Sequence, residues 1–229
     1  MSEPSDVRPS AFVRANLKDE VAAHLRDAIF SGSMSPGQRL DQDELARRLG
    51  VSKLPVREAL ISLESEGLVS NIPRRGAFVA EFTPDDVLDH YEIYGRVLGI
   101  AAGRAAISMS QGQVEELTRI HEKLQKAKDV AGQEELNFRF HREINLAGGT
   151  RRLRAIVRLL AHTLPDRFYE FASGWRDIAI GEHECILEAI RAGDAAAADQ
   201  AMRDHITSGG DYAIQMLKSM GYWDHASPD

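Results

Sequence analysis

The stretch RLDQDELARRLGVSKLPVREALISLESEGLVSNIPRRGAFVA, residues 39–80, decides the fold of the N-terminal part of this chain. A helix is expected to begin after Asp41, whose carboxylate can cap free backbone N–H groups, with Glu44 completing a capping box. This helix should end at Gly50, because glycine readily takes the left-handed conformation that closes a helix. Ser52 follows almost at once as the N-cap of a second helix. The two helices are therefore joined by a tight turn.

The second helix and the segment after it complete the pattern. Pro55 falls in the first turn of this helix, where its missing N–H leaves no intrahelical bond unmade, and Glu66-Gly67 ends it. Short apolar runs at residues 68–72 and 77–80 then surround the turn PRRG. They predict a β-hairpin with two arginines at its tip. Two helices joined by a tight turn and followed by a hairpin indicate a winged helix-turn-helix, whose ligand is duplex DNA.

Basic side chains gather where DNA would bind. No acidic residue occurs between Arg47 and Arg57, so a cationic patch surrounds the N-terminus of the second helix, where free N–H groups also attract phosphate. Lys53 and Arg57 are four residues apart and share an outward face, while the arginines of the hairpin suit phosphate or minor-groove contact. The alternative is a cationic, solvated surface on an ordinary helical domain. The predicted DNA-binding residues are Arg47, Arg48, Ser52, Lys53, Arg57, Arg74 and Arg75.

The motifs SKLPVREAL, LESEGLV and PRRGAFV resemble, in order and spacing, the DNA-binding domain of the GntR family of bacterial transcription regulators. The chain departs from that family's usual pattern at Asp43, where many members carry arginine, and at Lys53-Leu54, where Arg-Thr is common. The resemblance implies that the chain binds DNA in the manner of this family. The departures affect which bases it prefers.

Composition agrees with a DNA-binding protein that also has a second, acidic part. The chain has 229 residues, an apolar fraction of 43% and a net charge of -7. Residues 1–80 carry 11 basic and 11 acidic side chains, so the remaining 17 basic and 24 acidic ones account for the whole deficit. Cys185 is the only cysteine, which excludes a disulfide within the chain and a Cys-based zinc finger. We expect a cytoplasmic protein without a targeting segment or membrane span.

The expected fold class is mainly α, with an N-terminal winged helix-turn-helix domain and a C-terminal antiparallel bundle of about six helices. Apolar residues spaced four apart from Leu17 to Ile29 predict a third helix in the winged domain, and Thr83 can cap the first helix of the bundle. The expected parts are a flexible tail at 1–11, the winged domain at 12–81, a linker at 82–84, the helical domain at 85–220 and a tail at 221–229. The expected bundle helices span about 84–108, 110–129, 133–147, 150–172, 175–192 and 194–218.

Asn137 and His141 lie four apart on one face of a predicted helix, and His183 and His205 occur in later helices. Three imidazoles and an amide oxygen that converge inside a bundle would suit a divalent ion such as Zn²⁺, Ni²⁺ or Mn²⁺. Spacing alone leaves open that these histidines lie on solvated or hydrogen-bonded faces.

The C-terminal half resembles the FCD effector domain of the FadR subfamily of GntR regulators. That resemblance implies that Asn137, His141, His183 and His205 hold a divalent metal, zinc in the first place. Many members have aspartate where this chain has asparagine, so a small organic acid would supply the negative charge.

The resemblance also implies that Arg96, on the first helix of this domain, anchors the acid; the alternative for Arg96 is a surface salt bridge with Glu92. The chain departs from the family at Gly99, where glutamate is usual, and at Thr150, where asparagine is usual.

The resulting functional hypothesis is a homodimeric regulator, in the first place a repressor, that binds a pseudo-palindromic operator and changes affinity when an effector binds near the metal. Two alternatives belong to other classes. A metal-dependent hydrolase could also use three histidines and an open coordination position, although the chain has no HExxH motif. A DNA-binding protein without an effector would show salt-dependent binding with little sequence preference.

Overall fold

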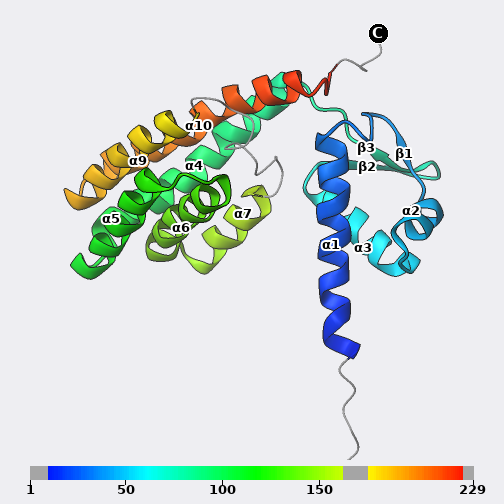
Figure 1. Cartoon of the computed structure of the whole chain (residues 1–229), viewed down its shortest axis with the longest axis horizontal. Helices are drawn as coiled ribbons and strands as arrows, with labels where there is room; N and C mark the ends of the chain where they lie inside the picture. The colour runs from blue at the N-terminus through cyan, green and yellow to red at the C-terminus, as the bar shows by residue number, and fades with distance from the viewer. Residues whose placement is uncertain (1–9, 162–174, 224–229) are drawn as a thin grey trace, which may run out of the picture. The chain divides into compact units, whose positions relative to one another are not determined.

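The structure, a computed structural model, describes residues 10–161 and 175–223 of the chain (Figure 1). The chain divides into two compact units, one made of residues 1–81 with 220–229 and the other of residues 82–219. The first unit contains the winged helix-turn-helix and the second is entirely helical in its described residues. The expected class, mainly α with a winged N-terminal domain and a helical C-terminal domain, is thus confirmed.

The N-terminal unit begins with α1 (Ser10–Phe30), which packs against α3. The helix-turn-helix consists of α2 (Gln42–Leu49) and α3 (Lys53–Ser65). Arg26 of α1 donates two hydrogen bonds to the Glu66 carboxylate, at 2.7 and 3.2 Å, and ties α1 to the end of α3. The apolar faces of these helices meet in a core that includes Leu25, Ile29, Val56, Leu60 and Leu63.

Local signals in the sequence explain the ends of α2. The Asp41 carboxylate accepts hydrogen bonds from the backbone N–H groups of Asp43 and Glu44, at 2.9 and 3.0 Å. Gly50 has a φ of 68°, the left-handed conformation expected at the end of this helix. Ser52 precedes α3 in an extended conformation, as an N-cap does, but its side chain makes no capping hydrogen bond. The hydroxyl of Ser52 therefore stays exposed at the start of α3.

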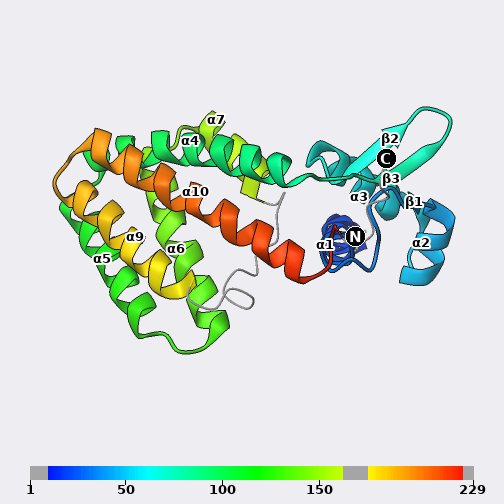
Figure 2. The same ribbon diagram turned by 90° about the horizontal axis from the view of Figure 1, so that it is seen from above.

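The wing contains one strand more than the sequence predicts. The predicted hairpin is β2 (Val69–Ile72) and β3 (Gly76–Val79), which Figure 2 shows projecting beyond the helices of its own unit. The additional strand β1 (Arg39–Leu40) pairs antiparallel with β3, so the order in the sheet is β1-β3-β2. Two residues are too few to show an alternating pattern. The pairing places Leu40 in the core, because Leu40 lies opposite Ala77.

The helical unit starts with α4 (Pro84–Ser108), which runs side by side with α10 (Ala195–Ser219) in the opposite direction (Figures 1 and 2). The other described helices are α5 (Gln111–Lys126), α6 (Val130–Gly148), α7 (Arg151–Ala161) and α9 (Trp175–Arg191). Of the helix expected at 150–172, residues 162–172 lie outside the described residues.

Capping side chains begin three of these helices, and the first of them, Thr83, was expected from the sequence. Thr83 and Asp86 form a reciprocal capping box at α4, and Ser110 and Gln113 form another at α5. The Asp194 carboxylate accepts from two backbone N–H groups at the start of α10. These side chains satisfy N–H groups that the first helical turn leaves without partners.

Glycines allow α4 to approach two other helices closely. A Cβ atom on Gly103 would lie 2.7 Å from the carbonyl oxygen of Ala195 in α10. At Gly148, the last residue of α6, a Cβ would lie only 1.8 Å from the carbonyl oxygen of Ala101 in α4. The close packing brings α4, α6 and α10 around a buried core that includes Leu98, Phe140, Ile144, Ile186 and Met202.

The end of the chain differs from the tail expected at 221–229. Tyr222 is 1% exposed, and its hydroxyl donates a 3.5 Å hydrogen bond to the carbonyl of Ala80. Both residues belong to the N-terminal unit. Burial of the large aromatic ring stabilises this segment by more than the conformational entropy that the short segment loses. This explains why the segment returns to the winged unit. The expected tail residues 1–9 and 224–229 lie outside the described residues.

In the part of the chain that the structure describes, we find no helix of the length and apolar character needed to cross a membrane.

Candidate DNA-binding surface and metal centre

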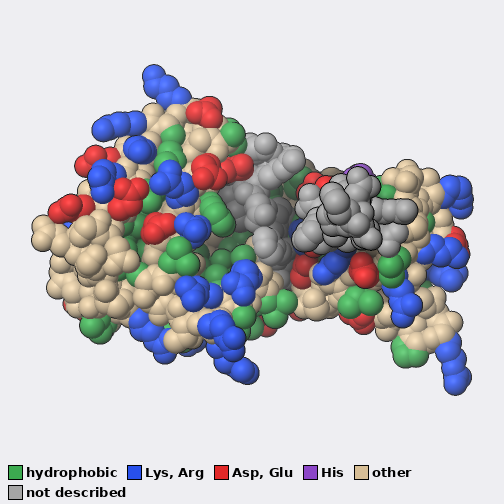
Figure 3. Space-filling view, turned by 90° about the horizontal axis from the view of Figure 1, so that it is seen from below, with side chains coloured by type: hydrophobic (Ala, Val, Ile, Leu, Met, Phe, Trp, Pro, Cys, Tyr) green, Lys and Arg blue, Asp and Glu red, His purple; other side chains and the backbone are tan. Residues whose placement is uncertain are grey.

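All of the predicted DNA-binding side chains are exposed. Arg47 and Arg48 belong to the last turn of α2, and Lys53 and Arg57 to the first turns of α3. The structure thus brings four cationic side chains to the two helices of the helix-turn-helix, next to the positive N-terminal end of α3. In Figure 3, Lys and Arg side chains project from the edge of the winged unit at the right, whereas basic and acidic side chains alternate over the helical unit.

The wing presents its two arginines on a tight turn. The backbone N–H of Arg75 donates to the carbonyl of Ile72 at 3.0 Å, and Arg74 has a φ of 64°. Proline at the second position and a positive φ at the third are features of a type II turn. The Arg75 guanidinium lies 5.6 Å from the centre of the Phe78 ring, a cation–π contact. Both guanidinium groups remain exposed for contact with an anionic ligand.

The sequence did not predict an ion pair between Asp43 of α2 and Lys53 of α3. These are two of the positions at which the chain departs from the usual GntR pattern. Their side chains are 64% and 65% exposed, so the pair lies on the surface of the helix-turn-helix. The carboxylate partly neutralises the Lys53 ammonium group, which otherwise would be free to contact phosphate.

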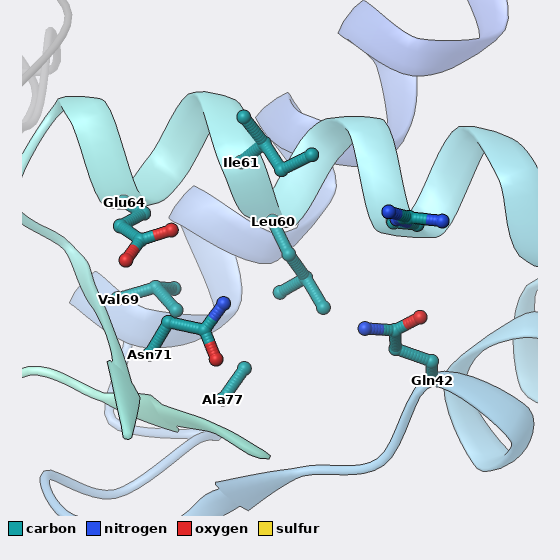
Figure 4. A pocket seen from close by; sticks show the side chains of 8 residues that line it. Gln42, Leu60, Ile61, Glu64, Val69, Asn71 and Ala77 are labelled. Carbon is teal, nitrogen blue, oxygen red and sulfur yellow. The ribbon is translucent and has the colours of Figure 1, made fainter. Parts of the chain in front are cut away.

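A shallow pocket lies between α3 and the strands of the wing (Figure 4). Its volume is about 130 Å³, below the range of about 300 to 1,000 Å³ that is usual for small-molecule sites. Its size and place therefore favour a surface feature of the DNA-binding unit over an effector site. The lining residues are Gln42, Arg57, Leu60, Ile61, Glu64, Val69, Asn71 and Ala77.

Three of the four predicted metal ligands meet inside the helical unit. His141 comes from α6, His183 from α9 and His205 from α10. Their Nε2 atoms form a nearly equilateral triangle, with distances of 3.2 Å from His141 to each of the other two and 3.1 Å between His183 and His205. We call these three residues the histidine triad. Among the described residues, the triad is the group of side chains best arranged to hold a cation.

The size of the triangle fits a divalent transition-metal ion. Nitrogen ligands about 2.0 to 2.1 Å from zinc lie about 3.3 to 3.4 Å apart at a tetrahedral angle and about 2.8 to 3.0 Å apart at a right angle. The observed separations of 3.1 and 3.2 Å fall between these limits. Three Nε2 atoms cannot approach this closely with only lone pairs between them, because their partial charges repel. A shared proton or a cation is needed.

Burial keeps two of the triad side chains neutral. His183 is fully buried, and its ring stacks on Phe140 with centroids 4.4 Å apart. Burial, with a further contribution from the neighbouring imidazoles, holds the pKa of His183 well below its usual value. Burial and the adjacent His205 lower the pKa of His141 to about 3. A neutral imidazole retains the lone pair that a metal requires.

Side chains around the triad include groups that the sequence did not identify as part of the site. The Nδ1 atom of His205 lies 2.8 Å from one carboxylate oxygen of Glu182, and the other oxygen accepts a hydrogen bond from the Ser208 hydroxyl at 2.9 Å. Within the described residues, the buried Nδ1 atoms of His141 and His183 have no hydrogen-bond partner, and neither has the buried side-chain oxygen of Asn145. Such atoms need partners from solvent or ligand.

Asn145 follows His141 by one helical turn, so the two residues lie on the same face of α6. Asn137 precedes His141 by one turn and is half-buried. Its role as a metal ligand stays a prediction.

A fourth buried histidine lies beside the triad. The ring of His121 is 6.2 Å from that of His183, and its Nε2 is 2.9 Å from the Glu184 carboxylate. Glu184 also pairs with Arg191 at 3.2 Å. Burial lowers the pKa of His121, while the negative charge of Glu184 opposes this shift. Of the two glutamates that flank His183, Glu182 therefore contacts a triad histidine, whereas Glu184 contacts His121 and Arg191.

Arg96 is exposed on α4 and donates through Nε and Nη2 to the Glu92 carboxylate. This geometry is that of the surface ion pair given above as the alternative for Arg96. Its role as an effector anchor stays a prediction.

Comparisons with known protein families match most of the chain. Residues 17–79 match the family of bacterial regulatory proteins called gntR, and residues 89–208 match the FCD domain. An HTH-type transcriptional regulator of Mycobacterium tuberculosis (strain CDC 1551 / Oshkosh) is 32% identical over 167 residues, which cover 73% of this chain and 68% of that protein. The HTH-type transcriptional repressor RspR of Escherichia coli (strain K12) is 26% identical, with coverage of 90% and 93%.

Among solved structures, that of E. coli McbR/YncC superposes with a TM-score of 0.62 at 25% identity, and the match covers 89% of this chain and 97% of that one. A transcriptional regulator described as a GntR family member, from Pseudomonas syringae pv. tomato str. DC3000, has a TM-score of 0.55 at 25% identity, with coverage of 96% and 92%.

Proposed function

Since this chain belongs to the GntR family of bacterial DNA-binding transcriptional regulators and carries an FCD domain, we propose that a metal ion and a small organic acid in its helical unit control its affinity for operator DNA. The observation that carries the regulatory part is the histidine triad, with three Nε2 atoms 3.1 to 3.2 Å apart in a unit separate from the DNA-binding one.

At the DNA, we assign base contacts to the start of α3 and phosphate contacts to the cations around it. Arg57 and Lys53 are the candidates for base edges, because the N-terminal residues of a recognition helix reach the major groove. The exposed Ser52 hydroxyl and the arginines of α2 and the wing would contact phosphates. DNA is the ligand, so we expect the protein to work in the cytoplasm.

In the helical unit, His141, His183 and His205 would hold a divalent ion, with Asn137 as an uncharged fourth ligand. Zinc is the first choice, because three imidazoles suit a borderline ion, and nickel or manganese would also fit nitrogen and oxygen ligands. When bound, such a metal supplies a Lewis-acid contact for a carboxylate. The acid would complete the coordination and use polar groups such as Asn145, whose buried side-chain oxygen otherwise has no partner among the described residues.

Regulation requires two states that bind the acid differently. A tenfold change in operator affinity corresponds to about 1.4 kcal/mol of coupling between the two sites. The E. coli relative is named a repressor, and we propose the same sign of regulation here.

We also propose a homodimer that binds two half-sites. On α4, exposed isoleucines recur every seven residues, at Ile93, Ile100 and Ile107, a spacing typical of a helix that packs against another helix. Sedimentation of the purified protein tests the dimer, and a monomer at micromolar concentration would contradict it.

The test of the whole proposal begins with an operator selected by the full-length protein from a random duplex library. Its affinity is then measured by fluorescence anisotropy with metal-free protein, with added Zn²⁺, and with Zn²⁺ plus each of a panel of small carboxylic acids. We expect at least one acid to change the affinity tenfold or more. The same affinity under every condition would contradict control by the helical unit.

His183→Ala provides the matched variant for this test, with His24→Ala, an exposed histidine on α1, as the control. The His183 variant should bind DNA but lose bound zinc and the response to acid, whereas the His24 variant should behave like the parent. A His183 variant that keeps its full response would remove the triad from the mechanism.

Family and homologue names indicate regulators and not hydrolases. The two glutamates that flank His183 are already engaged, Glu182 with His205 and Glu184 with His121 and Arg191. Sustained zinc-dependent turnover of generic esters or amides would favour the hydrolase over the regulator.

A further inference from the structure

Glu182 precedes His183 in the sequence, yet its carboxylate contacts a different member of the histidine triad. One oxygen lies 2.8 Å from Nδ1 of His205. Ser208 lies one turn after His205 on α10. Its hydroxyl donates to both carboxylate oxygens of Glu182, at 2.9 and 3.1 Å. Glu182 therefore links α9 to α10 directly behind the triad.

This contact determines which nitrogen of His205 carries a proton. A carboxylate accepts hydrogen bonds, so in the neutral form of His205 the proton lies on Nδ1 and Nε2 keeps its lone pair. The lone pair then points to the Nε2 atoms of His141 and His183, at 3.2 and 3.1 Å. In the described residues, the buried Nδ1 atoms of the other two triad histidines have no hydrogen-bond partner.

Charge gives Glu182 a second role. Imidazole and amide ligands, such as the histidine triad and the asparagine at position 137, offer a divalent cation no negative charge. Glu184, the other acidic neighbour of His183, pairs with His121 and with the Arg191 guanidinium, which offsets its charge. Glu182 pairs with a triad histidine, so its charge acts directly on a ligand.

We propose that Glu182 is a positioning residue of the metal centre, which orients His205 and supplies the negative charge that an acidic fourth ligand would otherwise provide. The proposal rests on the proposed metal site. A carboxylate that accepts the Nδ1 proton makes the imidazole a more basic ligand, and loss of such a partner usually weakens metal affinity about tenfold to a hundredfold.

The experiment compares two substitutions that remove the same charge from the same helix. Metal-free, full-length protein is titrated with Zn²⁺ against a chromophoric chelator, for the parent, Glu182→Gln and the matched control Glu184→Gln. The amide oxygen of glutamine can still accept from Nδ1 of His205, so the first substitution removes charge while it keeps the shape. We expect Glu182→Gln to weaken zinc binding about tenfold to a hundredfold and Glu184→Gln by less than about threefold.

Thermal unfolding of the metal-free proteins separates a structural role from a role at the metal. A positioning role predicts similar unfolding temperatures without metal and a smaller zinc-induced rise for Glu182→Gln. Equal zinc affinity of Glu182→Gln and parent would overturn the inference, and so would equal losses in both variants. A parent that binds no zinc would instead overturn the metal site itself.

If Glu182→Gln does not fold, Ser208→Ala replaces it. This variant removes the hydroxyl that holds the Glu182 carboxylate but leaves the carboxylate in place. Zinc affinity should then fall measurably, by about twofold to tenfold. An unchanged affinity would overturn the inference.

Discussion

Replacing Gly148 with alanine tests the close approach of α6 to α4, on which the position of His141 depends. The added Cβ would lie 1.8 Å from the carbonyl oxygen of Ala101 and 2.7 Å from the backbone nitrogen of Ala105. An ordinary contact needs at least 3.4 Å, so the two backbones must separate by about 1.6 Å. Both obstructing atoms belong to the backbone of α4, so no side chain can rotate out of the way.

Separation of the helices would loosen the core around Phe140 and Ile144, which α6 supplies. We expect a loss of about 3 kcal/mol or more in the free energy of unfolding, at the upper end for overpacking. For a protein of this size, that loss lowers the unfolding temperature by about 6 to 12 °C. Zinc affinity should fall as well, because His141 lies two turns earlier on the same helix.

Urea unfolding of the metal-free protein, followed by far-ultraviolet circular dichroism, measures this loss. The control is Gly112→Ala on α5, where an added Cβ meets no atom within 4 Å. Alanine has a higher helix propensity than glycine, so the free energy of unfolding of this control should rise by about 0.5 to 1 kcal/mol. A Gly148 variant that loses less than 1 kcal/mol would refute the close packing described for α4 and α6.

Three further predictions concern the DNA-binding surface and the response to pH. Arg57→Ala should weaken operator binding at least tenfold, or about 1 to 3 kcal/mol, and unchanged affinity would remove Arg57 from the interface. Asp43→Asn should free Lys53 to contact a phosphate. The plot of the logarithm of the binding constant for a random duplex against the logarithm of salt concentration should then become steeper by about 0.9, and an unchanged slope would contradict this role of the ion pair. Burial lowers the pKa of His90 to about 4, so the folded protein takes up a proton at His90 only near pH 4, while the unfolded chain does so near pH 6.5. Stability should therefore fall as the pH drops from about 6.5 to 4, by at most about 3 kcal/mol from this residue, and urea unfolding of His90→Gln should show a weaker pH dependence than the parent.

Much of the fold was predictable, because local signals coincide with the ends of its elements. Asp41, Gly50 and Thr83 act at helix ends through their own side chains or backbone conformation, and such effects depend on a few neighbouring residues. Strand β1 was missed because it is defined by its partner strand. The burial of Tyr222 was missed for a similar reason, since it depends on contact with Ala80, far away in the sequence.

The metal centre shows the same limit. The family resemblance indicated His141, His183 and His205, and the structure brings their Nε2 atoms together from three helices. The role of Glu182 could not be read from spacing, because Glu182 and Glu184 both flank His183 and only the packing of α9 against α10 distinguishes them. The ion pair between Asp43 and Lys53 likewise could not be predicted, because the sequence shows only that each residue departs from the usual GntR pattern.

The return of Tyr222 to the winged unit has a consequence for the covalent connection between the two units. The chain passes from the winged unit to the helical unit after Glu81 and passes back after Ser219, so two covalent connections join the same two bodies. The second connection continues directly from α10, the helix that carries His205. The backbone therefore joins the helix that carries His205 to the DNA-binding unit directly, and not only through the linker after Glu81.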